Sequence, residues 1–352
     1  MKAVRYYGKE DIRVEEIEEP KCGPGLVKLK PGFAGICGTD LHEYHDGANI
    51  CPTKPHGITG EKVPVVLGHE FSGTIEEIGA GVEGFKVGQN VAVFPIQWCG
   101  KCPACKRGLF NDCEDNGFYG LTGWGGGMAQ HLVCPPRHLI PLGDVPLDFG
   151  AVVEPLAVAW HSIDLSPFQP TDTVLVLGAG PIGLALIQSL KAKGATKIIV
   201  SEMAARRQKF AKEFGAMLVL DPSKDDVVAK VKEATGGDGA EIAFDAAGVQ
   251  PGLNQAFAAV KTRGTVVNVA IWPRPAYVDM NQFVYRELHY MGIATYLHQD
   301  FREVVQAISE GKLNPEPMIT ARISMDEVEE KGFKTLINDK ANHVKILVDA
   351  QR

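Results

Sequence analysis

The chain has 352 residues, 45% of which are hydrophobic, and a formal net charge of −7. This length predicts about two domains. Acidic and basic residues are interleaved, which excludes the basic patch of a nucleic-acid-binding protein, so we predict no nucleic-acid partner. The N-terminal residues MKAVRYYGKEDIRVEE lack the apolar core of a signal peptide, which predicts a cytoplasmic location.

The first 150 residues or so combine short strand-like runs and many Gly and Pro residues with few long helical patterns, which predicts a β-rich, barrel-like domain. Within it, GICGTDLHEY contains Cys37, GHE contains His69 and Glu70, and AVVEPLAVAWH contains Glu154. A thiolate, an imidazole and a carboxylate are the ligand types of an open catalytic zinc site. A lone cysteine is more often a small core residue, so from the residues alone both interpretations stay open.

Half of the chain's eight cysteines lie in the fifteen-residue stretch CGKCPACKRGLFNDC, as Cys99, Cys102, Cys105 and Cys113. Four thiolates at this spacing can close a tetrahedron around Zn²⁺, which predicts a structural zinc site with no open position. Disulfides are the first alternative, but the cytosol disfavours them. An iron–sulfur run would end C-x3-C-P, whereas here the last gap is seven residues and Glu114 follows. Four unrelated buried thiols are the third alternative.

The stretch DTVLVLGAGPIGLALIQSLKAKGATKIIVSE predicts a dinucleotide-binding turn. An apolar strand at 174–177 enters G-x-G-x-x-G, a helical pattern follows, and a second strand at 198–200 ends at Glu202, nineteen residues beyond the last glycine.

The glycines and Pro181 also argue against a membrane span here. The Glu202 carboxylate would accept hydrogen bonds from ribose hydroxyls and repel a 2′-phosphate, which favours NAD over NADP. Arg206 and Arg207 lie close enough to weaken that preference. The predicted cofactor-binding residues are Gly178, Gly180, Pro181, Ile182, Gly183, Glu202 and Arg207.

Further strand-like runs at 217–220, 241–247, 265–270 and 288–293 alternate with helical patterns such as 225–237. This alternation predicts a six-stranded, doubly wound parallel sheet. A helical run at 301–313 and a strand-like run at 343–349 are predicted to return to the β-rich domain. The predicted domains are therefore 1–155 with 296–352, and 156–295.

Taken together, these motifs resemble those of the zinc-dependent medium-chain dehydrogenases, the alcohol and polyol dehydrogenase superfamily. The resemblance covers nearly the whole chain and rests on motifs in the family's order: Cys37-Gly38-Thr39-Asp40, Gly68-His69-Glu70, the four-cysteine loop, Glu154-Pro155 and the nucleotide motif. It implies an α/β fold with a Rossmann domain and a GroES-like catalytic domain, two zinc ions per subunit, NAD, and a homodimer or homotetramer.

The resemblance also implies roles for single residues. Cys37, His69 and Glu154 would surround the catalytic zinc, and Glu70 would lie beside it as a ligand or just outside the ligand set. Thr39 and His42 would relay the alcohol proton to solvent. The cysteines of the four-cysteine loop (Cys99, Cys102, Cys105 and Cys113) would hold the structural zinc.

Within the superfamily, PHGITGEKVPVVLGHEFSG and VVEPLAVAWHSI are most similar to (R,R)-2,3-butanediol dehydrogenases, with sorbitol dehydrogenases next. The implied reaction interconverts (R,R)-2,3-butanediol and acetoin with hydride transfer to NAD. A sorbitol- or xylitol-type polyol dehydrogenase is the alternative. A zinc-free quinone reductase is disfavoured because Cys37, His69 and Glu154 occur together. A non-enzymatic NAD or zinc interaction protein is disfavoured because the composition indicates no basic or exposed apolar surface.

Overall fold

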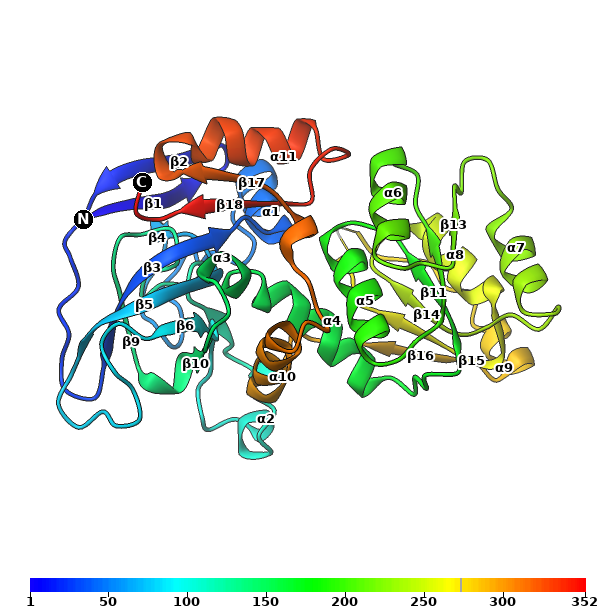
Figure 1. The fold of residues 1–352 in the computed structure, drawn as a ribbon, viewed down its shortest axis with the longest axis horizontal. Helices are drawn as coiled ribbons and strands as arrows, with labels where there is room; N and C mark the ends of the chain where they lie inside the picture. The colour runs from blue at the N-terminus through cyan, green and yellow to red at the C-terminus, as the bar shows by residue number, and fades with distance from the viewer. Residues whose placement is uncertain (273) are drawn as a thin grey trace. The chain divides into compact units, whose positions relative to one another are not determined.

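The computed structural model describes residues 1–272 and 274–352, which form two compact units (Figure 1). We call the first the β-rich unit; it comprises Met1–Glu154, Leu297–Gly311 and Pro315–Arg352. The second, the parallel-sheet unit, comprises Pro155–Tyr296 and Lys312–Asn314. Each unit contains its own cluster of buried apolar side chains. Among the helices of the described residues, none is long and apolar enough to cross a membrane.

The β-rich unit is built around a seven-stranded sheet in the order β10-β6-β5-β3-β18-β17, with β9 also paired to β3. Along β3 the buried Val27 and Leu29 alternate with Lys28 and Lys30, the period-two pattern of a strand that covers a core with one face. A three-stranded sheet (β2-β1-β4) and a two-stranded sheet (β7-β8) complete the unit. Its strands are β1 (Lys2–Gly8), β2 (Asp11–Glu16), β3 (Val27–Gly35), β4 (Val65–Val66), β5 (Glu70–Ile78), β6 (Asn90–Val93), β7 (Ile96–Gln97), β8 (Gly117–Phe118), β9 (Leu132–Cys134), β10 (Leu139–Pro141), β17 (Ile319–Ser324) and β18 (Lys345–Asp349).

The C-terminal strand lies inside this sheet rather than at its edge. β18 pairs antiparallel with β3, with Leu347 opposite Gly35, and parallel with β17. β3 in turn pairs with β5, with Gly35 opposite Glu70. The sheet therefore brings together residues that are hundreds of positions apart in the sequence.

Short helices connect the strands of the β-rich unit. Its α-helices are α1 (Gly38–Asp46), α2 (Pro103–Lys106), α3 (Leu147–Gly150), α10 (His298–Ser309) and α11 (Lys334–Asn338), while α4 (Val153–Leu165) crosses the boundary between the units. Short 3₁₀ segments lie at Phe110–Asp112, Pro136–His138, Glu316–Met318 and Met325–Glu327, and a π-helical segment lies at Val328–Phe333.

The parallel-sheet unit has the predicted doubly wound fold. Its six parallel strands have the order β13-β12-β11-β14-β15-β16, so the first strand in sequence lies in the middle of the sheet. Figure 1 shows helices on both sides of this sheet. The strands are β11 (Thr173–Leu177), β12 (Lys197–Ser201), β13 (Leu218–Leu220), β14 (Ala240–Asp245), β15 (Val260–Asn268) and β16 (His289–Gly292). The helices are α5 (Pro181–Ala192), α6 (Ala205–Glu213), α7 (Val227–Ala234), α8 (Gln250–Ala259) and α9 (Asn281–Arg286).

Candidate metal centres and nucleotide site

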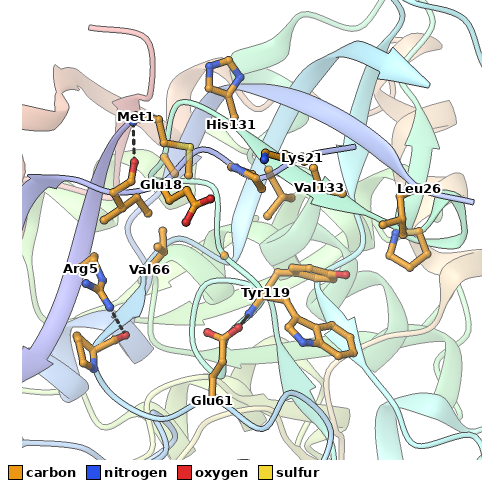
Figure 2. Close-up of a pocket in the computed structure, with 18 residues that line it drawn as sticks. Met1, Arg5, Glu18, Lys21, Leu26, Glu61, Val66, Tyr119, His131 and Val133 are labelled. Carbon is orange, nitrogen blue, oxygen red and sulfur yellow. Dashed lines mark hydrogen bonds between the residues drawn. The ribbon is translucent and has the colours of Figure 1, made fainter. Parts of the chain in front are cut away.

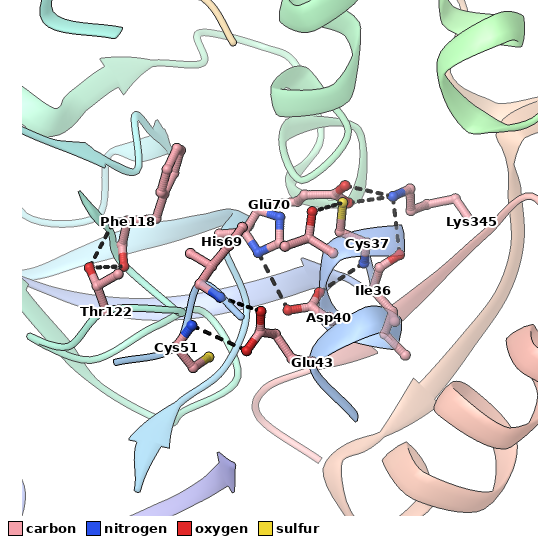
Figure 3. A network of polar contacts seen from close by, with 12 residues as sticks. Ile36, Cys37, Asp40, Glu43, Cys51, His69, Glu70, Phe118, Thr122 and Lys345 are labelled. Carbon is pink, nitrogen blue, oxygen red and sulfur yellow. Dashed lines mark hydrogen bonds and ion pairs between the residues drawn. The ribbon is translucent and has the colours of Figure 1, made fainter. Parts of the chain in front are cut away.

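Three of the predicted metal ligands meet at one point of the β-rich unit. The Cys37 sulfur, a His69 ring nitrogen and a Glu70 carboxylate oxygen all lie within 4.8 Å of one another (Figure 3). We call these three residues the Cys37 centre. Cys37 follows β3 and directly precedes α1, while His69 and Glu70 stand at the start of β5. The pairing of β3 with β5 therefore brings the thiol and the imidazole together.

The His69 ring is oriented by a neighbouring carboxylate. Its Nδ1 lies 3.4 Å from Oδ1 of Asp40, which leaves Nε2 as the available ligand atom. The other oxygen of Asp40 accepts a hydrogen bond from the Cys37 backbone N–H at 2.8 Å. A carboxylate behind a histidine is the usual support for a metal-binding imidazole. Asp40 therefore holds both the ring and the backbone of the thiol residue in place.

The electrostatics of the Cys37 centre fit a divalent cation. Burial, together with the charge of Glu70, raises the pKa of the Cys37 thiol. Burial by itself lowers the pKa of the His69 imidazole, but the charges of Asp40 and Cys37 outweigh burial and raise that pKa well above its usual value. A bound Zn²⁺ would offset this crowding of negative groups, and thiolate, imidazole and carboxylate are its usual ligands.

Sequence reasoning missed a lysine at this centre. Lys345, at the start of β18, is as buried as Glu70, and its Nζ lies 2.7 and 2.6 Å from the two Glu70 oxygens. Burial alone would lower the pKa of Lys345, but the charges of Glu70, Cys37 and Glu154 outweigh burial and raise it. The available signal was a single lysine within the apolar run HVKILVD.

The other predicted residues of this site lie at different depths. Glu154 is 7% exposed in the first turn of α4, and its charge acts on Lys345, but it is not among the residues within 4.8 Å of Cys37 and His69. The Thr39 hydroxyl is 3.7 Å from the Cys37 sulfur. The His42 side chain is 56% exposed on α1, with Nδ1 3.1 Å from Asp46. Thr39 thus adjoins the centre and His42 faces solvent.

The four cysteines from Cys99 to Cys113 form a second cluster, whose sulfur atoms all lie within 4.8 Å of one another. Backbone N–H groups point at three of the sulfurs: Cys99 N lies 3.2 Å from Cys113 Sγ, Cys102 N lies 3.4 Å from Cys99 Sγ, and Cys105 N lies 3.4 Å from Cys102 Sγ. The N–H of Cys105 lowers the pKa of Cys102 to about 6, whereas burial raises the pKa of Cys105 to about 12. Four converging sulfurs with amide donors fit a tetrahedral Zn²⁺.

Aromatic side chains attach this loop to the β-rich unit. Trp98 stacks on Phe110 with ring centroids 4.8 Å apart and packs against His138 at 5.1 Å. The Arg137 guanidinium lies 4.9 Å from the Trp98 ring. His298 of α10 stacks on Phe94 at 3.7 Å. The loop has few apolar residues of its own and depends on these neighbours for its position.

The predicted nucleotide turn joins β11 to α5. A side chain at Gly183 would place its Cβ 1.9 Å from the Gly178 carbonyl oxygen, so only glycine allows this tight approach. Glu202, directly after β12, accepts hydrogen bonds from Ala179 N at 2.7 Å and Ala204 N at 2.8 Å. The Arg207 guanidinium lies beside Gly180: a Cβ added at Gly180 would be 3.6 Å from it. The turn, the acid and the arginine form a cradle suited to a dinucleotide.

A separate pocket of about 690 Å³ opens elsewhere in the β-rich unit (Figure 2). Its lining is mostly apolar and includes Tyr119 and Trp124, with Arg5, Glu61 and His131 among its charged or titratable residues. Arg5 donates to the Pro64 carbonyl at 2.9 Å, and Glu61 accepts from Trp124 N at 3.0 Å. No predicted metal ligand lines this pocket, so it is distinct from the Cys37 centre.

The two units and the two cysteine-containing centres define a zinc-binding dehydrogenase, and comparison with known proteins agrees. Residues 23–144 match the alcohol dehydrogenase GroES-like domain and residues 181–310 match the zinc-binding dehydrogenase family. The chain belongs to the zinc-binding, medium-chain alcohol dehydrogenases, which confirms the predicted family and fold.

Within this family, the chain is similar to several butanediol dehydrogenases. The chain is 42% identical to the (R,R)-butanediol dehydrogenase of Neisseria gonorrhoeae and 43% identical to that of Bacillus subtilis, with 99% of each chain covered in both cases. The crystal structure of 2R,3R-butanediol dehydrogenase from Bacillus subtilis superposes with a TM-score of 0.93, at 42% identity and 99% coverage of both chains.

Proposed function

We propose that this protein interconverts (R,R)-2,3-butanediol and acetoin, with zinc and NAD as cofactors. The observation that carries the proposal is the convergence of Cys37, His69 and Glu70. It occurs in a chain whose relatives, matched over nearly the full length, are named (R,R)-butanediol dehydrogenases. Zinc would be held by Cys37 and His69 with Glu154, and when bound it supplies Lewis acidity that lowers the pKa of an alcohol. The β-rich unit (predicted 1–155 and 296–352) serves as the catalytic domain, and the parallel-sheet unit (predicted 156–295) binds NAD.

The residues around the Cys37 centre divide the remaining work. Asp40 orients His69. The Thr39 hydroxyl lies beside the thiol, and as it takes the alcohol proton it releases its own, which reaches water through the exposed His42. Such a relay contributes about 10²–10⁴-fold to the rate. Glu202 receives the ribose hydroxyls and disfavours a 2′-phosphate, which supports NAD.

We also propose a homodimer or homotetramer. β16 is an edge strand of the parallel sheet, and among the described residues several exposed apolar side chains lie in this strand or shortly before it in the sequence. An unpaired strand edge can pair with another chain, and exposed apolar side chains that gather on a surface mark interaction sites. The exposed side chains in question are Ile271, Tyr277, Met280, Val284, Tyr285 and Tyr290. A cytoplasmic location remains a prediction.

The first test is the initial rate of NAD⁺ reduction with (2R,3R)-butanediol, measured against D-sorbitol at the same concentration, with NADP⁺ run in parallel. We expect a clear preference for the butanediol and for NAD⁺. A preference for sorbitol would assign the chain to the polyol dehydrogenases with the same zinc chemistry. No turnover of either substrate by zinc-loaded protein would contradict the proposal.

A further inference from the structure

The ion pair between Lys345 and Glu70 uses all the bonding capacity of the lysine. Nζ donates to both carboxylate oxygens of Glu70, at 2.7 and 2.6 Å, and to the Ile36 carbonyl at 3.1 Å. An ammonium has three N–H donors, and here each has an acceptor. The two side chains are only 2% and 1% exposed, so water does not screen the pair. This pairing therefore fixes the orientation of the Glu70 carboxylate.

Glu70 nevertheless lies within reach of the metal ligands. One Glu70 oxygen lies within 4.8 Å of the Cys37 sulfur and of a His69 ring nitrogen. The sulfur and the nitrogen also lie within 4.8 Å of each other. A carboxylate with no other partner, so close to two metal ligands, would turn toward a cation bound there and occupy a coordination position. With Cys37, His69 and the proposed Glu154 as its three protein ligands, zinc would have only that position left for substrate. The direction in which Glu70 points therefore decides whether the centre is open.

The neighbouring backbone is shaped around the ion pair. Gly35 is opposite Glu70 in the β3–β5 pairing. A Cβ at Gly35 would lie 2.2 Å from Glu70 Oε2 and 3.2 Å from Lys345 Cδ. The missing side chain at position 35 thus provides the space in which the carboxylate meets the ammonium. Any larger residue there would push Glu70 away from Lys345.

We propose that Lys345 is a positioning residue that holds the Glu70 carboxylate off the catalytic metal and so keeps one coordination position open. The inference rests on the proposed function, because it requires a metal held by Cys37 and His69. A lysine that only neutralised a buried charge would affect stability when removed. A positioning lysine also determines the ligand set of the metal.

The test uses the full chain with Co²⁺ in place of zinc and imidazole as the probe of the open position. The four-cysteine loop is closed, so the imidazole-dependent change in the cobalt absorption spectrum reports only on the Cys37 centre. In Lys345→Met we expect Glu70 to ligate the metal, altering the spectrum without imidazole and weakening imidazole binding about 10–100-fold. Lys345→Arg, which keeps the charge, should bind imidazole nearly as the native protein does.

Three further variants separate positioning from loss of structure. Lys345→Met combined with Glu70→Gln should recover imidazole binding, because the competing carboxylate is gone. Gly35→Ala should resemble Lys345→Met, and it tests the proposal even if Lys345→Met does not fold. Lys28→Met is the matched control. Lys28, on β3, is also largely buried and paired with a carboxylate, that of Glu19. Its loss should leave the cobalt spectrum unchanged.

Native-like imidazole binding and spectra in both Lys345→Met and Gly35→Ala would overturn the inference, while turnover of butanediol by the native enzyme would leave the proposed function intact. Loss of imidazole binding that Glu70→Gln fails to restore would likewise overturn it. If native cobalt protein shows no imidazole response that depends on Cys37, the proposed function fails together with the inference.

Discussion

The two candidate metal centres of this protein are assembled in opposite ways. The four-cysteine loop takes all its sulfurs from residues 99–113, a single stretch of chain. The Cys37 centre takes its groups from β3–α1, the start of β5 and, through Lys345, the last strand of the protein. A site made of local residues can be recognised from spacing alone. A site made of distant residues depends on the sheet that brings them together.

The surroundings of the two centres differ as well. Backbone N–H groups are the closest partners of the loop sulfurs, and they are fixed by the turn geometry. The Cys37 centre itself contains Glu70, and its neighbours Asp40 and Lys345 are ionisable side chains. Fixed amides suit a centre that only holds a loop in place. Charged side chains can orient a ligand set and keep a position open for substrate.

The largest effect is expected at the Cys37 centre. Cys37→Ser should lower kcat/KM for butanediol by about 10³-fold or more, because the Lewis acid supplies several kcal/mol of transition-state stabilisation. The melting temperature should change little, since strand pairing does not depend on this thiol. The half-buried Cys22, which contacts backbone carbonyls, provides the control variant Cys22→Ser. Equal losses of activity and thermal stability in Cys37→Ser would contradict a catalytic rather than structural role for the Cys37 centre.

A smaller loss is expected beside the same centre. Thr39→Ala should reduce kcat by about 10²-fold, the lower end for a lost proton relay, and should leave zinc content unchanged. Thr39→Ser keeps the hydroxyl and should restore most of the rate. Steady-state kinetics with metal analysis checks this. Native-like turnover by Thr39→Ala would remove Thr39 from the mechanism.

A cysteine substitution in the four-cysteine loop should lower thermal stability and leave most of the activity. Cys105→Ser is expected to lower the melting temperature by about 5–10 °C, because metal binding contributes directly to the stability of such a loop. The variant should lose one of two zinc ions and keep most of its activity per folded molecule. Calorimetry and zinc analysis measure both. A fully active and equally stable variant would exclude a structural metal here.

The smallest effect concerns the aromatic support of this loop. Burial lowers the pKa of His138 to about 3, so the folded protein keeps this histidine neutral. Below pH 6.5 the unfolded chain binds a proton that the folded chain does not, so the free energy of unfolding falls as pH falls toward 3. Between pH 7 and 5 this amounts to about 1–2 kcal/mol.

Denaturant unfolding of native protein and His138→Gln at pH 7 and 5 tests this expectation. The variant should lose less stability than the native protein over the same interval. The exposed His289 supplies the control His289→Gln, which should behave as native. An identical pH dependence in all three proteins would show that His138 does not support the loop through its neutral state.

Most of the fold follows from local patterns. The six strands of the parallel sheet were predictable because apolar runs of three to seven residues alternate with helical patterns and glycines. The G-x-G-x-x-G turn was predictable because its glycines answer a local steric need, as the contact of Gly183 with Gly178 shows. The cysteine loop followed from spacing alone.

What the sequence by itself determined is therefore whatever neighbouring residues decide: strand and helix periods, the nucleotide turn, the four-cysteine loop and the family to which these motifs point. Tertiary structure alone decided that Lys345 faces Glu70, that Gly35 makes room for the pair and that Asp40 orients His69. The physical reason is strand pairing. The β18–β3–β5 register joins residues near both ends of the chain, and no local pattern encodes which buried charge will find which partner.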